Sequence, residues 1–134
     1  DSHNIRLTTL CDTDEETFAE RSKMVVDKGG EKPMTEWDMH KVFADPDIHA
    51  VSFATPNHWH ALGAMWSCQA GNHVNVEKPA MHNLWEGRKM IEAARKYDRR
   101  MQVGFQNRSI ANVMEAMKFL HEGGIGKVYM ARGL

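Results

Sequence analysis

The sequence has little of several features that mark particular classes of protein. Its 17 basic residues are matched by 18 acidic ones, so a formal net charge of −1 provides no field that favours nucleic acid or an anionic membrane. No apolar run approaches the roughly 18 residues of a membrane-spanning helix. Internal repeats and low-complexity segments are absent. With 134 residues, the chain is long enough for one hydrophobic core but not for two.

Cysteine is also scarce, and its placement argues against a metal or redox site. Cys11 and Cys68 lie in apolar stretches outside any metal-binding or redox spacing, so we expect two buried free thiols. His58 and His60 are two positions apart, whereas zinc ligands on one helix face are four apart. No cysteine or acid completes a ligand set. We predict no metal, and a substrate- or cofactor-facing role for one of these histidines at a helix start.

Apolar strands alternate with helical segments along the whole chain. Short runs of β-branched and apolar residues predict strands at 5–11, 50–54, 73–76, 101–105 and 126–130. Helical spacing predicts helices at 13–28, 58–70, 84–98 and 109–122, and a short one after Thr35. Such alternation is typical of an α/β fold with a doubly wound parallel sheet, covered by helices on both faces. We place a domain boundary in the glycine-rich turn after residue 122, so that a second domain begins at 123–134.

The same patterns predict several details of packing. Thr13 and Glu16 have the spacing of a capping box, which indicates a helix start. The strand at 50–54 is nearly all apolar, which is typical of a strand covered on both faces. The residues expected to face the core are Trp37, Val42, Phe43, Leu62, Met65, Trp66, Leu84, Ile91, Ala94, Val113, Met117 and Leu120.

Polar residues follow the carboxyl ends of the predicted strands, where an open parallel sheet binds its ligands. Asp12 follows the first strand, at the place of an acid that accepts the ribose hydroxyls of a dinucleotide. A carboxylate there repels a 2′-phosphate, so it favours NAD over NADP. A compatible alternative is that Asp12 caps the following helix. The other strand ends carry Thr55-Pro56-Asn57-His58-Trp59-His60, Glu77-Lys78-Pro79 and Gln106-Asn107-Arg108.

Lys78 lies between Glu77 and Pro79 at a strand end, where its side chain is held in place. Hydride transfer from a secondary alcohol requires removal of the hydroxyl proton, which a lysine can accept directly or through a histidine. Its cation can also orient the alcohol or the nicotinamide amide. The alternative is a surface lysine before a turn, and the Lys-Pro pair alone favours that alternative.

These segments together resemble the Gfo/Idh/MocA oxidoreductases, the family of glucose–fructose oxidoreductase and inositol dehydrogenase. The resemblance covers nearly the whole chain, and the Glu-Lys-Pro tripeptide after a strand is its most specific signal. The Asn-His-Trp-His segment is most similar to branches that act on sugars, glycosides or cyclitols. The matching segments are Asp47–Val51, Thr55–Asn57, His60, Ala70–Gly71, Glu77–Pro79, Trp85–Arg88, Val103–Gln106 and Gly126–Val128.

The resemblance implies a partial N-terminal Rossmann domain and the start of a C-terminal α/β substrate domain, whose open sheet often forms a homo-oligomer interface. It implies NAD as the cofactor and Lys78 as the catalytic residue near the reacting hydroxyl. The Lys78–Pro79 bond is often cis in relatives, which fixes the direction of the lysine. The cofactor-binding residues that it implies are Asp12 at the adenosine ribose, Thr55, Pro56, Asn57 and His60 along the cleft, Glu77 and Lys78 at the nicotinamide ribose, and Gln106 and Arg108 at the boundary with the substrate.

The sequence departs from the family pattern at both ends. The family's first strand and its Gly-x-Gly-x-x-Gly turn are absent, and the chain opens at Asp1 without a methionine. We expect that strand, and any targeting segment, to precede Asp1, so localisation (cytoplasmic, or exported by a twin-arginine signal) stays open. The turn would bind the pyrophosphate, and the second domain would carry the aspartate–histidine or tyrosine–histidine pair of relatives. We therefore expect these 134 residues alone to bind NAD poorly and to catalyse nothing.

Three functions remain open for the whole protein. The first is an NAD-dependent oxidoreductase that takes a hydride from a hydroxyl-bearing carbon of a sugar, glycoside or cyclitol. The second is a glycoside hydrolase that oxidises C3 transiently, eliminates the glycosidic group, adds water and returns the hydride. The third is a non-catalytic regulatory protein with the same fold. The intact Glu77-Lys78-Pro79 argues against the third, because such a protein has no chemical need for the lysine.

Overall fold

The computed structural model describes residues 5–133. The chain divides into two compact units, of which the first ends at Val103 and the second starts at Gly104. The predicted domain boundary after residue 122 lies within the second unit and stays a prediction. The strands are β1 (Thr9–Cys11), β2 (Met34–Glu36), β3 (Ala50–Phe53), β4 (His73–Val76) and β5 (Met101–Val103). The helices are α1 (Thr17–Asp27), α2 (Met39–Ala44), α3 (Asn57–Ala70), α4 (Leu84–Lys96), the 3-10 helix η1 (Gln106–Ser109) and α5 (Ala111–His121).

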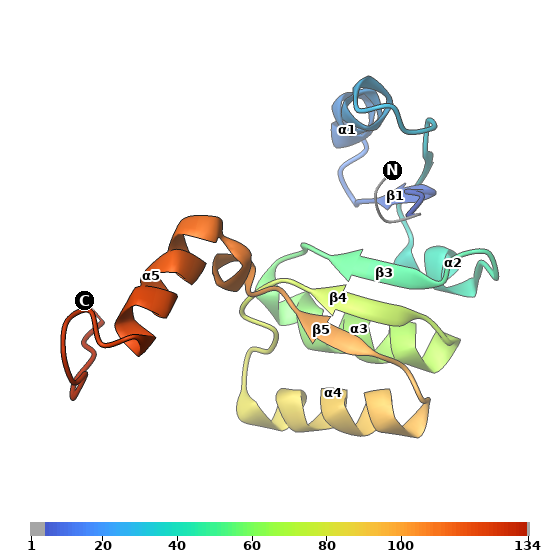
Figure 1. The fold of residues 1–134 in the computed structure, drawn as a ribbon. Helices are drawn as coiled ribbons and strands as arrows, with labels where there is room; N and C mark the ends of the chain where they lie inside the picture. The colour runs from blue at the N-terminus through green and yellow to red at the C-terminus, as the bar shows by residue number, and fades with distance from the viewer. Residues whose placement is uncertain (1–4, 134) are drawn as a thin grey trace. The chain divides into compact units, whose positions relative to one another are not determined.

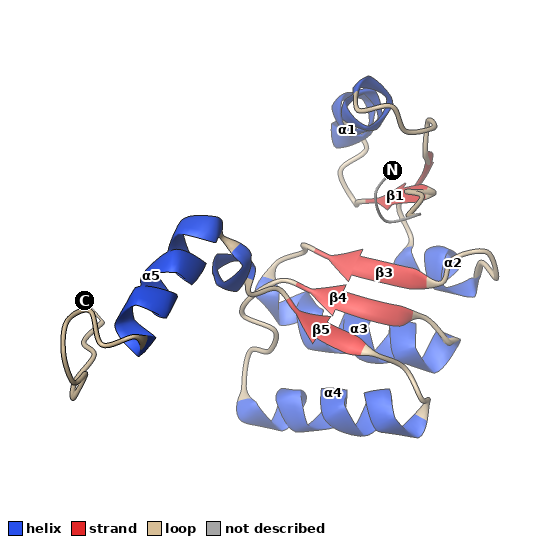
Figure 2. Cartoon of the chain, in the orientation of Figure 1, coloured by secondary structure: helices blue, strands red, loops and turns tan. Residues whose placement is uncertain are grey.

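All strand pairs among the described residues are parallel. Strands β3, β4 and β5 form one sheet in that order, with Val51 opposite Val74 and Val74 opposite Met101. Strands β1 and β2 form a separate two-stranded sheet, with Leu10 opposite Thr35. Figure 2 shows the strands and helices alternating along the chain. The predicted α/β fold with parallel sheets is therefore confirmed.

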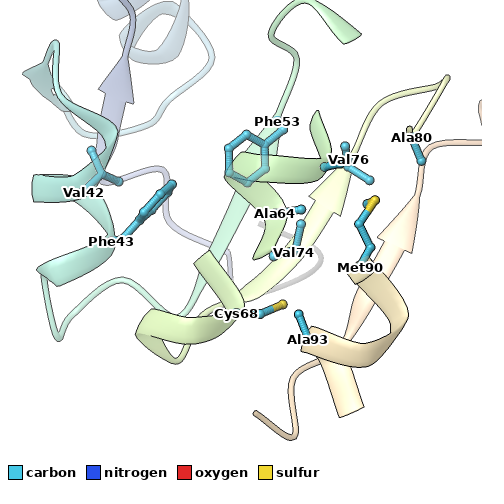
Figure 3. Close-up of a cluster of buried hydrophobic side chains, with 11 residues drawn as sticks. Val42, Phe43, Phe53, Ala64, Cys68, Val74, Val76, Ala80, Met90 and Ala93 are labelled. Atoms are coloured by element: carbon cyan, nitrogen blue, oxygen red, sulfur yellow. The ribbon is translucent and has the colours of Figure 1, made fainter. Parts of the chain in front are cut away.

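The core of the first unit lies between the three-stranded sheet and helices α3 and α4, which lie on the same side of that sheet (Figure 1). Figure 3 shows Val74 and Val76 of β4 near Cys68 of α3 and Met90 of α4. Strand side chains alternate between faces, so both valines of β4 are buried while His73 is only half-buried. This face of the sheet sets the position of the loops that follow β3 and β4.

Small residues form the buried face of α3. A Cβ atom at Gly63 would lie 2.6 Å from Cε1 of Phe53, so the helix approaches the sheet as closely as glycine allows. Met65 and Trp66 pack against the core as predicted, but from its side, and the prediction was wrong for Leu62. Leu62 is exposed and the other two are half-buried. The buried residues of α3 are His60, Ala61, Gly63, Ala64, Ser67 and Cys68.

The buried face of α4 differs from the expected one in the same way. The buried residues are Gly87, Met90 and Ala93. Leu84 and Ile91 were predicted to be buried but are 85% and 49% exposed, and Ala94 is half-buried. Apolar spacing alone did not distinguish this face from its neighbour, because two of its buried residues, Gly87 and Ala93, are small and carry a weak hydrophobic signal.

The first turn of α1 does not form the predicted capping box. The side chains of Asp12 and Asp14 accept hydrogen bonds from the backbone nitrogens of Asp14 and Glu16, at 3.0 and 3.1 Å. These turns occupy the segment where the helix was expected to begin, so α1 starts at Thr17 without a side-chain cap. The capping-box prediction at Thr13 and Glu16 was therefore wrong.

Strand β2 was not predicted, and a helix start was expected near Thr35. The extended segment arises because its backbone pairs with β1, which the three-residue stretch does not indicate by itself. Asp38 then caps α2 by accepting a hydrogen bond from the backbone nitrogen of His40 at 2.9 Å. Val42 and Phe43 are buried as predicted. Trp37 precedes the helix and is 59% exposed, so its predicted inward position was wrong.

Other differences concern surfaces that the described residues leave uncovered. Ala50 and Ser52 of β3 are exposed, so the structure does not show the predicted cover on both faces of that strand. Within the second unit, Val113 and Met117 are 40% and 45% exposed, and α5 buries no residue. Leu120 is half-buried. The segment 126–130 forms no strand there, contrary to prediction.

The two cysteines are both free thiols, as expected, but only Cys68 is buried. Cys11 ends an edge strand and is exposed, so its predicted burial was wrong. Within residues 5–133, no helix combines the length and the apolar character needed to cross a membrane.

Candidate functional site

Asp12 follows β1 directly, as predicted, and its carboxylate is exposed. Its backbone nitrogen donates to the carbonyl of Glu36 at 3.2 Å, which ties the ends of β1 and β2 together. One carboxylate oxygen accepts the backbone nitrogen of Asp14 and so forms a turn before α1. The carboxylate thus lies at a strand end where a ribose could reach it, and it also shapes the local turn.

Glu36 is a second acid at a strand end, and sequence reasoning missed it. Its Oε1 accepts the backbone nitrogens of Trp37 and Asp38 at 2.9 and 3.1 Å and lies 3.4 Å from Nζ of Lys41. The hydrogen bond from Asp38 is the main cause that lowers the pKa of the Glu36 carboxyl, with smaller contributions from Trp37 and Lys41. The signal in the sequence was an acid at the end of a short segment. That segment could be recognised as a strand only from its pairing with β1.

Acidic groups gather around Cys11 at this end of the small sheet. Partial cover of its sulfur raises the pKa of the Cys11 thiol, and the carboxylates of Glu36, Asp12 and Asp38 raise it further. The local field is therefore negative, which disfavours an anionic group such as a 2′-phosphate.

The segment Thr55-Pro56-Asn57 connects β3 to α3. The carbonyl of Pro56 accepts the backbone nitrogen of Trp59 at 2.9 Å, and Asn57 is the first helical residue, with an exposed side chain. The Thr55 hydroxyl is buried and has no hydrogen-bond partner within the described residues. An unpaired buried hydroxyl costs roughly 1–3 kcal/mol, so this position suits a further polar partner.

Lys78 lies at the carboxyl end of β4, where the sequence predicted it. The backbone nitrogen of Glu77 donates to the carbonyl of Phe53 at 3.0 Å, which extends the β3–β4 pairing to the residue before the lysine. The Lys78–Pro79 peptide bond is cis, and Ala80 is buried in the core. The Lys78 side chain is exposed, and its ammonium has no hydrogen-bond or ion-pair partner in the described part of the chain.

The side chain of His60 is buried and does not face an open cleft. It is 2% exposed, and its two ring nitrogens lie 2.7 Å from the carbonyl oxygen of Pro79 and 2.8 Å from that of Thr55. The ring thus lies beneath the two loops, in contact with both. His58 lies two residues earlier and is exposed.

Gln106 and Arg108 belong to the second unit, on η1, and both are exposed. Their expected place at the boundary between cofactor and substrate stays a prediction. No three histidine, cysteine, aspartate or glutamate side chains within residues 5–133 come together in a way that would hold a metal ion.

The geometry so far is that of an open parallel sheet with polar groups following successive strands, and comparison with known proteins identifies its family. The profile of the Gfo/Idh/MocA group, described as an oxidoreductase family with an NAD-binding Rossmann fold, matches residues 1–105. The chain belongs to this family. Its predicted Rossmann fold and its cofactor, NAD, follow from that membership.

Several characterised members of the Gfo/Idh/MocA family are similar to the chain. Levoglucosan dehydrogenase from Pseudarthrobacter phenanthrenivorans is 36% identical over 105 residues, which are 78% of this chain and 26% of that protein. Myo-inositol 2-dehydrogenase from Thermotoga maritima is 28% identical over 127 residues, 94% of this chain and 36% of that protein. The chain therefore spans about a quarter to a third of the length of these relatives.

Solved structures of the family agree. The WlbA dehydrogenase from Bordetella pertussis, crystallised with NADH and UDP-GlcNAcA, superposes with a TM-score of 0.76 at 27% identity, over 92% of this chain and 34% of that one. The myo-inositol 2-dehydrogenase from Lactobacillus plantarum superposes with a TM-score of 0.80 at 24% identity, over 94% of this chain and 36% of that one, which supports the fold.

The residues of this Gfo/Idh/MocA chain fit an NAD-binding site in three respects. The Asp12 carboxylate is exposed in a negative field, the Thr55 hydroxyl is buried without a partner among the described residues, and the Lys78 ammonium is exposed between anchored neighbours. The contacts of these residues with NAD stay predictions. They concern groups that the fold leaves available at strand ends.

Proposed function

We propose that the whole protein is an NAD-dependent dehydrogenase that takes a hydride from a hydroxyl-bearing carbon of a sugar, glycoside or cyclitol. The observation that carries the proposal is the exposed Lys78 ammonium at the carboxyl end of β4, held between an anchored Glu77 and an anchored Pro79. Relatives named as levoglucosan, myo-inositol and D-glucoside 3-dehydrogenases support this class of substrate. Assembly into a homo-oligomer through a second domain is part of the same proposal.

In this proposal each strand end has its own task. Asp12 accepts hydrogen bonds from the adenosine ribose hydroxyls, and its charge disfavours a 2′-phosphate. Thr55, Pro56 and Asn57 line the cleft after β3. When NAD is bound, its nicotinamide ring supplies the hydride acceptor. Glu77 contacts the nicotinamide ribose, and Gln106 and Arg108 approach the substrate side.

Lys78 acts on the substrate hydroxyl. Loss of a hydride from a secondary alcohol leaves a carbonyl only if the hydroxyl proton also departs, so a group must receive or relay that proton. The Lys78 ammonium orients the hydroxyl. It relays the proton by giving one of its own protons to a base and taking up the hydroxyl proton in its place. Its exposure and its lack of a partner among residues 5–133 leave it available for this contact.

The test is an assay of the whole protein with NAD and a panel of glycosides, sugars and cyclitols, in which NADH formation is measured. We expect turnover with at least one substrate, and a loss of about 100- to 10,000-fold in kcat for Lys78→Ala, the range for a group in proton transfer. Lys96→Ala, an exposed lysine at the end of α4, is the matched control and should retain activity. Activity that survives Lys78→Ala would show that the lysine has no role in the chemistry, whereas the absence of turnover with every substrate would favour a regulatory protein of this fold.

A second candidate function is glycoside hydrolysis with transient oxidation. It is favoured by one relative, a glycosyl hydrolase family 109 protein from Shewanella pealeana, which is 28% identical over 94 residues. Such an enzyme returns its hydride at the end of each cycle. Release of the aglycone without net NADH would support the hydrolase, whereas stoichiometric NADH would support the dehydrogenase.

A further inference from the structure

The first turn of α3 contains a polar side chain that is almost completely buried. His60 is 2% exposed, and each of its ring nitrogens lies within 2.8 Å of a main-chain carbonyl oxygen. One carbonyl belongs to Thr55, after β3, and the other to Pro79, after β4. A single ring therefore joins the two loops that follow neighbouring strands.

The contacts of the His60 ring lie just beyond the carboxyl ends of β3 and β4. The last main-chain hydrogen bond between the two segments in the described structure runs from the nitrogen of Glu77 to the carbonyl of Phe53 at 3.0 Å. Beyond it the loops are joined by the His60 ring. Lys78 is consequently anchored on both sides, through Glu77 on one and through the Pro79 carbonyl on the other.

The two contacts place a requirement on the ring. Carbonyl oxygens only accept hydrogen bonds, and a neutral imidazole has one donor and one acceptor nitrogen. At least one ring nitrogen therefore donates to its carbonyl, and the other nitrogen lies within hydrogen-bond distance of the second carbonyl.

We propose that His60 is a positioning residue for Lys78, which it holds because its two ring nitrogens bridge the carbonyls of Thr55 and Pro79. The inference rests on the proposed function, since it gives His60 its effect through the lysine. It replaces the expectation that His60 itself lines the cofactor cleft. The ring is too deeply buried to touch a ligand, and both of its polar atoms are engaged.

Substitutions in the whole protein test the positioning role. His60→Leu removes both ring nitrogens and His60→Gln keeps a side-chain donor, so we expect kcat to fall about 100-fold in the first, as for a small misplacement of a reacting group, and less in the second. The KM for NAD should stay within a few-fold. His49→Gln, at an exposed histidine before β3, is the matched control. Rates are expressed per folded molecule, with the folded fraction taken from thermal unfolding.

A Lys78→Ala background separates positioning from general stability. If His60 acts through Lys78, His60→Leu should cause no further loss of kcat in that background, because the two changes remove the same interaction. An additional loss equal to that in the wild type would overturn the proposal. So would an unchanged kcat per folded molecule for His60→Leu in the otherwise native enzyme.

Solvent exchange of the histidine ring protons in nuclear magnetic resonance spectra tests the loop contact directly. The His60 signal, assigned by its absence in His60→Gln, should show a ring proton that exchanges slowly with solvent, as expected for an N–H that donates to a carbonyl in a buried site. A ring proton that exchanges as fast as that of the exposed His58 would overturn the contact. This readout does not depend on turnover. A wild type without hydride transfer would therefore refute the proposed function and the role through Lys78, while the spectra would still decide how the ring joins the loops.

Discussion

At the residue scale, the carboxylate of Glu36 shows how local backbone can hold a charge at a strand end. Two backbone nitrogens and the Lys41 ammonium surround one of its oxygens. These contacts favour the charged form, which is why the pKa of this carboxyl is lowered. A lowered pKa means that the folded protein binds this proton less tightly than the unfolded chain does.

The pH dependence of stability follows from that sign. The stabilisation from Glu36 is fully present above the ordinary glutamate pKa and is lost as the pH falls through the lowered value. We expect Glu36→Gln to lower the Tm at neutral pH, and this difference from the wild type to disappear in acid. Thermal unfolding across a pH series measures this difference. Glu15→Gln, at an exposed acid in the turn before α1, is the control. A Tm difference that persists unchanged in acid would contradict the assignment.

At the element scale, α3 lies close to the sheet because its buried face has few large side chains. Gly63 faces the ring of Phe53, and the neighbouring buried positions are alanine, serine and cysteine. The larger residues of α3 lie to the side, where the Trp66 ring packs 4.6 Å from that of His40 between centroids. The close approach places the first turn of α3, and with it His60, directly under the strand-end loops.

Gly63→Ala tests that close approach. The added methyl group would lie 2.6 Å from a ring carbon of Phe53, so we expect a loss of about 1–3 kcal/mol in the free energy of unfolding, typical of overpacking. Urea unfolding measures it. Gln69→Ala, at an exposed position of the same helix, should change stability by less than about 0.5 kcal/mol. Phe53→Leu in the Gly63→Ala background should recover part of the loss, because it removes the ring that the methyl group meets.

At the scale of the whole molecule, the strand ends carry only part of the proposed dinucleotide site. The groups that we propose contact the ribose and the nicotinamide follow β1, β3 and β4, but residues 1–134 contain no Gly-x-Gly-x-x-Gly turn to present backbone donors to a pyrophosphate. Strands β1 and β3 belong to separate sheets. We therefore expect these residues to contribute to NAD binding only through the groups proposed at the two ends of the cofactor.

Calorimetric titration of the 134-residue chain with NAD measures this contribution. We expect binding weaker than micromolar, because the pyrophosphate charge would have no backbone donors to contact. The whole protein, titrated under the same conditions, is the control and should bind more tightly. Micromolar binding by the 134-residue chain would contradict the expectation and would mean that the strand-end groups suffice.

The sequence by itself determined the order of elements from β3 to β5 and the strand ends that carry the candidate site. Apolar runs placed β3 and β4 to within a residue, and the polar residues after β1, β3 and β4 identified Asp12, Thr55 and Lys78 as candidates. These features are local: they depend on side-chain period and on which residues interrupt it. Glycine after α3 and the Glu-Lys-Pro tripeptide after β4 are readable for the same reason.

Only the tertiary structure decided which helix faces are buried, that Met34–Glu36 is a strand, and that His60 lies under two loops. Each of these depends on a neighbour distant in sequence: Phe53 against Gly63, β1 against β2, and Pro79 against His60. Close packing rewards small residues that carry little hydrophobic signal, and a backbone pairing or a carbonyl contact leaves no trace in side-chain periodicity. Those contacts form only when the chain has brought the two partners together.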